Sequence, residues 1–358
     1  HYPLRRQRQM CIRDRSLLHS TIEKRGLCLS DVILKVEDLV TSFQTEGGKV
    51  TAIDGVSFEV RKGRTLGVVG ESGSGKSVTS LSIMGLLPKP SGQIDSGTIE
   101  YDGKNLANLN LEEMYKIRGN KIAMIFQEPM TALNPVKKIG KQLEEVYQLH
   151  FPEMSSEDMR AKSIDLLSQV GIPSPEQRVK EFPHQLSGGM RQRAMIAMAL
   201  ACEPDILIAD EPTTALDVTI QAQILELMEE LQKKSDMSIL FITHDLGVIA
   251  ELCDDVIVMY AGRVVEAAPV ETIFDSPKHP YTKGLLSSIP RLEDERKTKL
   301  RTIEGMVPSL ADMPKGCRFE NRCPYAGDKC KHSVPQFEAV AEGHKVRCFK
   351  WKSVGEGQ

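Results

Sequence analysis

The chain has 358 residues, and its 46 Lys and Arg nearly balance its 49 Asp and Glu, giving a formal net charge of −3. This balance argues against a protein that binds nucleic acid through a broadly basic surface. Hydrophobic residues make up 41% of the sequence, as in ordinary globular proteins, and the length suits one large and one smaller domain. The apolar runs are all shorter than the roughly 18 residues of a membrane span, so we expect any membrane role to require partner chains.

Residues 1–30 differ in composition from the rest of the chain. The stretch HYPLRRQRQMCIRDR is rich in Arg and has no apolar core. Such a segment suits a targeting arm or a basic arm on a membrane surface, but its composition and position favour a disordered or non-native leader. We therefore expect the folded chain to begin near Asp31.

Two kinds of strand are predicted. Residues 34–40, 52–60 and 97–103 have Gly and Asp at their turns, which is typical of an antiparallel layer. Short continuous apolar runs, by contrast, are typical of strands buried on both faces of a parallel sheet. The chain has these runs at residues 122–126, 206–210, 239–243 and 256–260.

Residues 70–77, GESGSGKS, satisfy the pattern G-x-x-x-x-G-K-[ST] in full. A buried strand is predicted before them at 65–70 and a helix after them at 77–87, which is the context that a phosphate-binding loop requires. Glycines let successive N–H groups point into one concavity, where Lys76 reaches the β- and γ-phosphates and the Ser77 hydroxyl ligates Mg²⁺. The predicted nucleotide contacts are Gly70, Ser72, Gly73, Ser74, Gly75, Lys76, Ser77 and Val78.

The alternation of strands and helices around this loop predicts an α/β fold, a P-loop NTPase (RecA-like) core with an antiparallel β layer. Residues 217–234 are one of the separating helices, with Ile224, Leu225, Met228 and Leu231 on one face. Residues 130–200 carry amphipathic helices in place of strands and predict an inserted helical subdomain. Proline becomes frequent from about Ala267, which indicates a small appended domain.

Two further patterns belong to phosphate chemistry. The buried strand at 206–210 ends in Asp210 and Glu211, where the first carboxylate suits Mg²⁺ and the second suits a general base for water. Residues 186–193, LSGGMRQR, place a Gly pair before an apolar helix, which makes a second anion site from bare N–H groups. Two anion sites on one chain indicate a composite site shared between two copies.

These motifs, together with Gln127 in FQEP, ALD at 215–217 and His244 in ITHD, resemble those of the ATPase subunit of an ABC transporter from about Asp31 to the C-terminus. The resemblance implies a head-to-tail pair of ATPase subunits. It also implies an ABC ATPase domain over 31–266, followed by a C-terminal domain over 267–358.

The resemblance further assigns roles residue by residue. Glu211 would be the general base, His244 the γ-phosphate contact, and Gln127 a contact of Mg²⁺ and the attacking water. Ser187, Gly188 and Gly189 would face the partner's ATP, Asp217 would lie in the loop that crosses the dimer interface, and Phe43 would stack on adenine. The alternative interpretation of Phe43 is an ordinary core residue at the end of a strand. Met190 stands where the general pattern has Gln, without touching the phosphate-facing N–H groups.

The C-terminal residues indicate which subfamily of ABC transporter ATPases the chain resembles. Residues 276–286 and 316–330 resemble the C-terminal region of oligopeptide and dipeptide importer ATPases, and residues 70–88 and 126–135 resemble their "D" type. The same tail occurs in relatives that serve nickel and glutathione, so those solutes remain alternatives. The resemblance implies two integral membrane permease subunits, a second ATPase subunit that is homologous or identical, an extracytoplasmic peptide-binding protein and no nucleic acid. It places the chain peripherally on the cytoplasmic face of the membrane.

The tail also gathers cysteines in the pattern C-x5-C-x6-C-x17-C, at Cys317, Cys323, Cys330 and Cys348. Four thiolates that converge could hold zinc or an iron–sulfur cluster, or the site could hold no metal. The C-x2-C spacing of structural zinc sites is missing, and members of the resembled importer family carry a [4Fe–4S] cluster in this region, so we expect the cluster, with zinc as the alternative. A disulfide is disfavoured in a reducing compartment, and Cys202 and Cys253 are expected to be buried packing residues.

Two other function classes fit the sequence less well than transport does. A soluble ABC-type ATPase acting on DNA or ribosomes usually has two ATPase domains, a coiled-coil insertion or a basic linker, and the sequence shows none of these. A regulatory protein that binds ATP without hydrolysing it would not need Glu211 and His244. An energy-coupling ATPase of an importer is therefore the leading interpretation, with ATP and Mg²⁺ as its nucleotide and metal.

Overall fold

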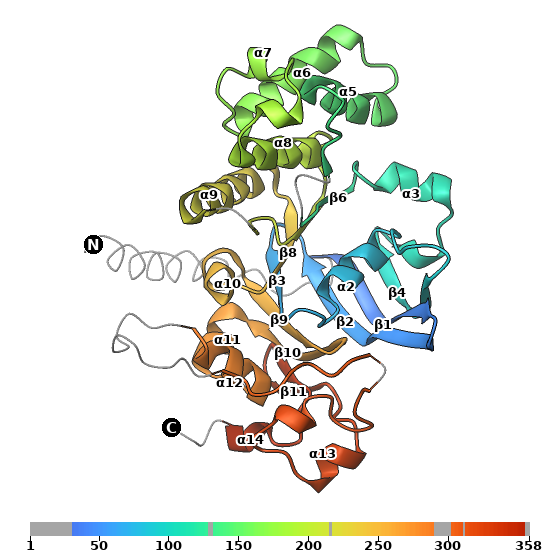
Figure 1. Ribbon diagram of the computed structural model, residues 1–358, viewed down its shortest axis with the longest axis vertical. Coiled ribbons are helices and arrows are strands. Elements are labelled where there is room, and N and C mark those ends of the chain that lie inside the picture. The colour runs from blue at the N-terminus through green and yellow to red at the C-terminus, as the bar shows by residue number, and fades with distance from the viewer. Residues whose placement is uncertain (1–30, 128–131, 215–216, 290–301, 311, 355–358) are drawn as a thin grey trace, which may run out of the picture. The chain divides into compact units, whose positions relative to one another are not determined.

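The computed structural model describes residues 31–127, 132–214, 217–289, 302–310 and 312–354 (Figure 1). Residues Ile33–Gln358 form one compact unit. The predicted leader, residues 1–30, lies outside the described residues. So do residues 128–131, which include the last two residues of the FQEP motif, and two residues of the ALD motif (215–216), whereas Gln127 and Asp217 are described.

A four-stranded antiparallel sheet forms the layer predicted near the start of the folded chain, in the order β2-β1-β4-β5. Its strands are β1 (Val32–Thr45), β2 (Gly48–Arg61), β4 (Gly92–Tyr101) and β5 (Lys104–Asn105). Val36 pairs with Ile99 across β1 and β4, and both side chains are buried. This sheet shares an apolar core with one face of the larger sheet, where Val68, Ile208 and Leu240 lie.

The larger sheet has eight strands in the order β11-β12-β10-β9-β3-β8-β7-β6. The five consecutive strands β9, β3, β8, β7 and β6 run parallel to one another, as the continuous apolar runs predict. They are β3 (Thr65–Val69), β6 (Ile122–Ile125), β7 (Ile206–Asp210), β8 (Ser238–Thr243) and β9 (Asp255–Tyr260). Every residue of β3, β7 and β8 is buried, because helices and the antiparallel layer cover both faces.

The helix after the phosphate-binding loop is shorter than predicted. Helix α2 covers Lys76–Ile83, where the sequence predicts residues 77–87. Gly85 has φ +60, a left-handed conformation that ends a helix. The other helices that flank the sheets are α3 (Leu111–Ile117), α9 (Val218–Ser235) and α10 (Leu246–Leu252). In α9, Ile224, Leu225 and Met228 are buried as predicted.

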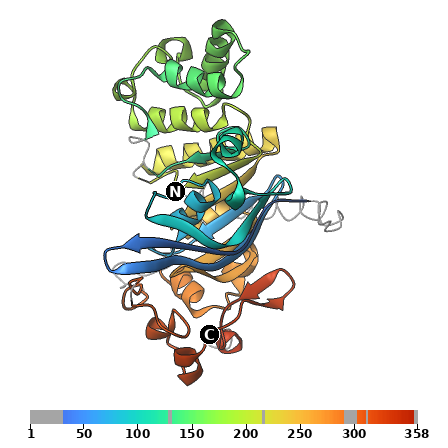
Figure 2. The same ribbon diagram turned by 90° about the vertical axis from the view of Figure 1, so that its right-hand side faces the viewer.

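Helices occupy the predicted insertion. They are α5 (Ile139–His150), α6 (Ser156–Gln169), α7 (Pro175–Arg178), the short η3 (Pro183–Gln185) and α8 (Gly188–Leu200). Figures 1 and 2 both show them together beyond the β6 edge of the sheet, at the end opposite to the C-terminal segment. Among the residues that the structure describes, no helix has the length and apolar character needed to cross a bilayer.

The C-terminal segment is continuous with the larger sheet. Strand β12 (His344–Val346) pairs antiparallel with β10 (Arg263–Pro269), and β11 (Glu338–Ala341) pairs with β12. Around these strands lie α11 (Val270–Asp275), α12 (Pro280–Ser287), η4 (Glu320–Arg322), α13 (Asp328–His332) and α14 (Trp351–Val354). The domain boundary near residue 267 remains a prediction.

Buried Glu266 on β10 links several parts of the C-terminal segment. Its carboxylate accepts hydrogen bonds from the backbone N–H groups of Lys278 and His279 and faces His344 Nε2 at 2.8 Å. A carboxylate with no exposed surface is stable only when it is satisfied in this way. Glu266 therefore fixes the start of α12 and the β10–β12 pair in one arrangement.

Candidate active site

The predicted phosphate-binding loop joins the carboxyl end of β3 to the start of α2, and β3 lies between the parallel strands β9 and β8. Gly75 caps α2 with φ 99 and ψ 3, a conformation that side chains disfavour. A Cβ atom on Gly70 would lie 2.2 Å from the Met259 carbonyl oxygen. The loop therefore needs glycine at both positions, for backbone conformation at one and close packing at the other.

Lys76 lies buried inside this loop. Its Nζ donates to the carbonyl oxygens of Gly70 at 2.7 Å and Glu71 at 3.1 Å. Burial lowers the pKa of the ammonium, while the carboxylates of Glu211, Asp210 and Glu71 act in the opposite direction. The side chain is thus held at the centre of the loop, close to the two carboxylates predicted to act with it.

Ser77 and Asp210 lie together, as a magnesium site requires. Burial raises the pKa of Asp210 and Glu211 adds to the rise, whereas hydrogen bonding to Ser77 and the charge of Lys76 lower it. Asp210 Oδ1 is buried without a hydrogen-bond partner in the described part of the chain. A carboxylate oxygen in this position beside a serine hydroxyl is an oxygen-rich set that fits Mg²⁺.

Glu211 is the centre of a small polar cluster. Its Oε2 accepts from Gln127 Nε2 at 3.0 Å and from Thr214 Oγ1 at 3.0 Å, and its Oε1 lies 3.3 Å from His244 Nδ1. Glu211 has φ 47, which is uncommon for a residue with a side chain. Its N–H donates to the Ile242 carbonyl at 2.8 Å, so the structure around it holds this strained conformation in place.

The cluster keeps Glu211 ionised. Burial raises the pKa of this carboxyl, but the hydrogen bonds from His244 and Thr214 and the charges of His244 and Lys76 outweigh it, so the pKa lies below its ordinary value. A carboxylate that stays charged at neutral pH can accept a proton from water. Gln127 and His244 therefore orient the same group that sequence patterns identify as the general base.

Other predicted site residues lie elsewhere on the chain. Ser187 caps α8 and its Oγ accepts from the Met190 N–H at 3.3 Å, while a Cβ on Gly188 would meet nothing within 4 Å. Gly189 packs toward Ile220. Figure 1 shows α8 apart from α2, which carries Lys76 and Ser77. Ser187 and Gly188 are thus exposed and do not complete the site of their own chain.

The remaining predicted contacts are at the edges of the site. Asp217 is exposed and caps α9, with Oδ1 accepting from Thr219 N at 3.1 Å and Ile220 N at 3.0 Å. Phe43 is half-buried near the end of β1, opposite Gly92 on β4. In the loop, Ser72 and Gly73 are exposed, Ser74 is buried and Val78 is half-buried on α2.

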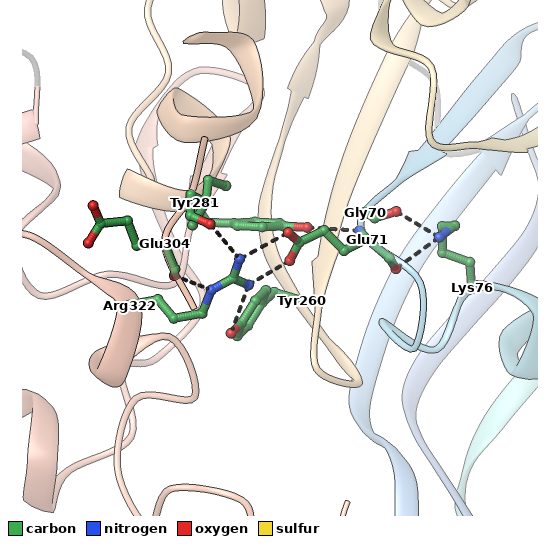
Figure 3. Close-up of polar contacts among 8 residues, drawn as sticks. Gly70, Glu71, Lys76, Tyr260, Tyr281, Glu304 and Arg322 are labelled. Carbon is green, nitrogen blue, oxygen red and sulfur yellow. Dashed lines mark hydrogen bonds and ion pairs between the residues drawn. The ribbon is translucent and has the colours of Figure 1, made fainter. Parts of the chain in front are cut away.

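Sequence reasoning missed several partners of the site. Thr214 is one, although its position three residues after Glu211 is a usable signal. The others lie in the C-terminal segment. Arg322 binds the Glu71 carboxylate with both terminal nitrogens, and the Glu71 N–H donates to Tyr281 Oη at 2.8 Å (Figure 3). No local pattern marks these contacts, because 251 residues separate Arg322 from Glu71.

The four predicted cysteines line one cavity in the C-terminal segment, with Phe319, Tyr325 and Phe349 among the other lining residues. Backbone N–H groups two residues further on favour three of the thiolates: Phe319 for Cys317, Tyr325 for Cys323 and Lys350 for Cys348. For the last pair the nitrogen–sulfur distance is 3.3 Å. Burial outweighs these bonds and raises the pKa of Cys323 to about 11 and that of Cys348 to about 12.

Among the described residues, no three His, Cys, Asp or Glu side chains lie close enough to hold a single metal ion. The described cysteines all carry free thiols. Cys202 and Cys253 are buried in the apolar core, as predicted.

The chain is similar in sequence to known transport proteins. The sequence matches the family "ABC transporter" over residues 53–214 and the family "Oligopeptide/dipeptide transporter, C-terminal region" over 265–330. The Bacillus subtilis oligopeptide transport ATP-binding protein OppD is 55% identical over 317 residues, covering 88% of each chain. The dipeptide transport ATP-binding protein DppD of the same organism is 54% identical, covering 88% of this chain and 94% of the relative.

A solved structure is similar as well. The dimeric structure of MJ0796, a bacterial ABC transporter cassette, has a TM-score of 0.59 and 28% sequence identity. The match covers 66% of this chain and 98% of the cassette. The P-loop NTPase fold predicted from the sequence is therefore confirmed.

Proposed function

Because this chain belongs to the ABC transporter family of ATPases, we propose that it hydrolyses ATP to drive import of di- or oligopeptides through integral membrane permease subunits. One observation carries the catalytic part: the Glu211 carboxylate is held by Gln127, Thr214 and His244 within electrostatic reach of Lys76. This arrangement brings a base, its orienting groups and a phosphate-binding cation into one site.

The reaction is phosphoryl transfer to water. Glu211 accepts a proton as the water oxygen attacks the γ-phosphorus, and the bond to the oxygen that bridges the β- and γ-phosphates breaks to give ADP and phosphate. Lys76 balances the charge of the phosphate oxygens. Ser77 and Asp210 would hold Mg²⁺, which supplies charge neutralisation when bound. Gln127 and His244 keep the Glu211 carboxylate oriented, and His244 is proposed to contact the γ-phosphate as well.

The second half of the site belongs to another ATPase subunit, homologous or identical, in a head-to-tail pair. Support comes from the exposed positions of Ser187 and Gly188 at the start of α8, apart from the loop of their own chain. Asp217 would lie at the same interface, and the similar MJ0796 cassette is dimeric. Phe43 is proposed to stack on adenine, from its place at the end of β1.

The cargo is inferred from the C-terminal segment. Residues 265–330 match a region that oligopeptide and dipeptide transporters share, and the relatives OppD and DppD are named for those solutes. The chain would then lie peripherally on the cytoplasmic face of the membrane, bound to two permease subunits that receive peptide from an extracytoplasmic binding protein. Nickel and glutathione are the alternative solutes.

We further propose that Cys317, Cys323, Cys330 and Cys348 hold a [4Fe–4S] cluster. The fit rests on the shared cavity and on backbone N–H groups aimed at three of the sulfur atoms, which stabilise thiolate ligands. Among the described residues, no three ligand side chains lie close enough for a single metal ion such as zinc. Each iron of a cluster binds a different cysteine, so a wider set suits it. The cluster would stabilise a small segment that has little core of its own.

Two experiments test these proposals. The chain is co-purified with its permease subunits in lipid vesicles, and ATPase activity is measured with the binding protein and peptides, glutathione or nickel. Stimulation by peptides supports the proposed cargo, and stimulation by glutathione or nickel alone contradicts it. For the cysteines, anaerobic purification should give brown protein with iron and acid-labile sulfide, which Cys330→Ser should lose. Colourless protein with stoichiometric zinc would refute the cluster.

A further inference from the structure

Arg322 joins the cysteine-bearing segment to the phosphate-binding loop (Figure 3). Its side chain is 4% exposed. Nη1 and Nη2 lie 2.6 Å and 3.0 Å from the two Glu71 carboxylate oxygens. The same guanidinium donates to the carbonyl oxygens of Glu304 at 3.0 Å and Ile303 at 3.3 Å, and to Tyr260 Oη at 3.4 Å. All three nitrogens are engaged, so the group is fixed in both position and orientation.

Glu71 is held at every polar group. Its N–H donates to Tyr281, its carbonyl oxygen accepts from Lys76, and its carboxylate binds Arg322. The Tyr281 side chain is fully buried against Tyr260 and Phe319, with ring centroids 4.7 Å and 5.4 Å away. Glu71 is therefore the residue through which the C-terminal segment contacts the loop and its phosphate-binding lysine.

The charge of Glu71 requires this partner. A carboxylate in a loop that receives a triphosphate repels the ligand unless a cation neutralises it. The Glu71 charge already acts on Lys76, because it opposes the lowering of the Lys76 pKa that burial causes. The bidentate bond to Arg322 neutralises the carboxylate and holds it on the side of Glu71 opposite to Lys76 (Figure 3).

We propose that Arg322 is a positioning residue for ATP, which neutralises Glu71 and fixes the loop, and that the cysteine-bearing segment thereby sets the ATP affinity. Arg322 ends η4 and directly precedes Cys323, and Cys317 lies shortly before η4. Any change at the cysteine cavity that moves this segment moves the guanidinium as well. The inference rests on ATP binding and holds whichever solute is transported and whatever the cysteines bind.

The test measures the dissociation constant of ATP for the full-length chain, together with KM and kcat. Arg322→Gln leaves the Glu71 carboxylate unpaired beside the triphosphate, so we expect the dissociation constant and KM to rise about tenfold while kcat changes little. In the double variant Glu71→Gln/Arg322→Gln the repelling charge is gone, and affinity should return to within about threefold of wild type. Arg160→Gln, an exposed position on α6, is the matched control and should bind ATP as wild type does.

Two results overturn the proposal. One is a folded Arg322→Gln protein that binds ATP as tightly as Arg160→Gln. The other is a double variant that binds as weakly as the single, because lost packing rather than unpaired charge would then be the cause. If Arg322→Gln fails to fold, Arg322→Lys decides: it keeps a positive charge beside Glu71 but loses the two-pronged bond, so the dissociation constant of ATP should rise less than about threefold, and a rise of about tenfold would refute neutralisation as the cause.

The contribution of the cysteine segment is tested by coupling. Cys323→Ser should weaken ATP binding about threefold in the wild-type background and add nothing further in the Glu71→Gln/Arg322→Gln background. Equal weakening in both backgrounds would show that the cavity acts by another route. These binding measurements need no transport, so a failed import assay leaves them unchanged, and their failure leaves the import proposal standing.

Discussion

Replacing Glu211 by Gln removes the proposed general base while keeping its size. The carboxylate accepts from Gln127 and Thr214 on Oε2 and faces His244 on Oε1. An amide can place its oxygen on only one of these sides, so its NH₂ group must face either two donors or the imidazole. The variant therefore loses both proton acceptance and part of the orientation of its neighbours.

The expected loss follows from the role of the group. General base catalysis contributes about 10²- to 10⁴-fold, so kcat should fall by that factor, equivalent to roughly 3 to 5 kcal/mol of barrier. ATP binding depends on Lys76 and the loop, which the substitution does not touch. With hydrolysis blocked and binding intact, the ATP-bound dimer should accumulate.

The assay combines steady-state ATP hydrolysis, ATP affinity and oligomer size with and without ATP. Glu226→Gln, an exposed position on α9, is the control and should behave as wild type in all three. A Glu211→Gln protein whose kcat stays within about threefold of wild type would falsify the assignment of the base. Loss of ATP binding in parallel with hydrolysis would instead point to a structural role for Glu211.

Three further predictions concern pH and stability. Hydrogen bonding from His244 lowers the pKa of Glu211. His244→Gln should therefore raise that pKa and move the acid limb of the pH–rate profile to higher pH. An acid limb that does not shift would contradict the effect of His244 on the Glu211 pKa. Glu266→Ala leaves buried donors on Lys278, His279 and His344 unsatisfied, so denaturant titration should show a loss of about 3 kcal/mol, with exposed Glu271→Ala as a near-neutral control. Tyr281→Phe removes only the hydroxyl that accepts from Glu71 and should cost about 1 kcal/mol; no measurable loss would mean that the bond is replaced.

Local patterns were sufficient for the elements of the site. The loop at 70–77 lies between a buried strand and a helix as predicted, because glycine spacing and apolar runs act through near neighbours. The parallel strands follow from their continuous apolar composition, since a strand buried on both faces tolerates little else. The end of α2 was not predicted correctly. The sequence pattern still favours a helix at Gly85, but the left-handed conformation of this residue ends the helix.

Contacts between residues far apart in the sequence could not be predicted from local patterns. Ser77 and Asp210 were each predicted from their motifs to ligate Mg²⁺, but the hydrogen bond from Thr214 to Glu211 depends on the strained backbone at Glu211, which no motif shows. The cysteines were expected to converge, and their shared cavity and N–H bonds appear only once the C-terminal segment is folded against β10.

The sequence by itself determined the chemistry of this protein: a phosphate-binding loop, two carboxylates after a buried strand and a four-cysteine tail. Only the tertiary structure decided how the tail meets the loop. Arg322 and Glu71 are 251 residues apart, and no periodicity or spacing connects residues so distant. Their contact arises because packing of Tyr281 and Phe319 against Tyr260 brings the two segments together.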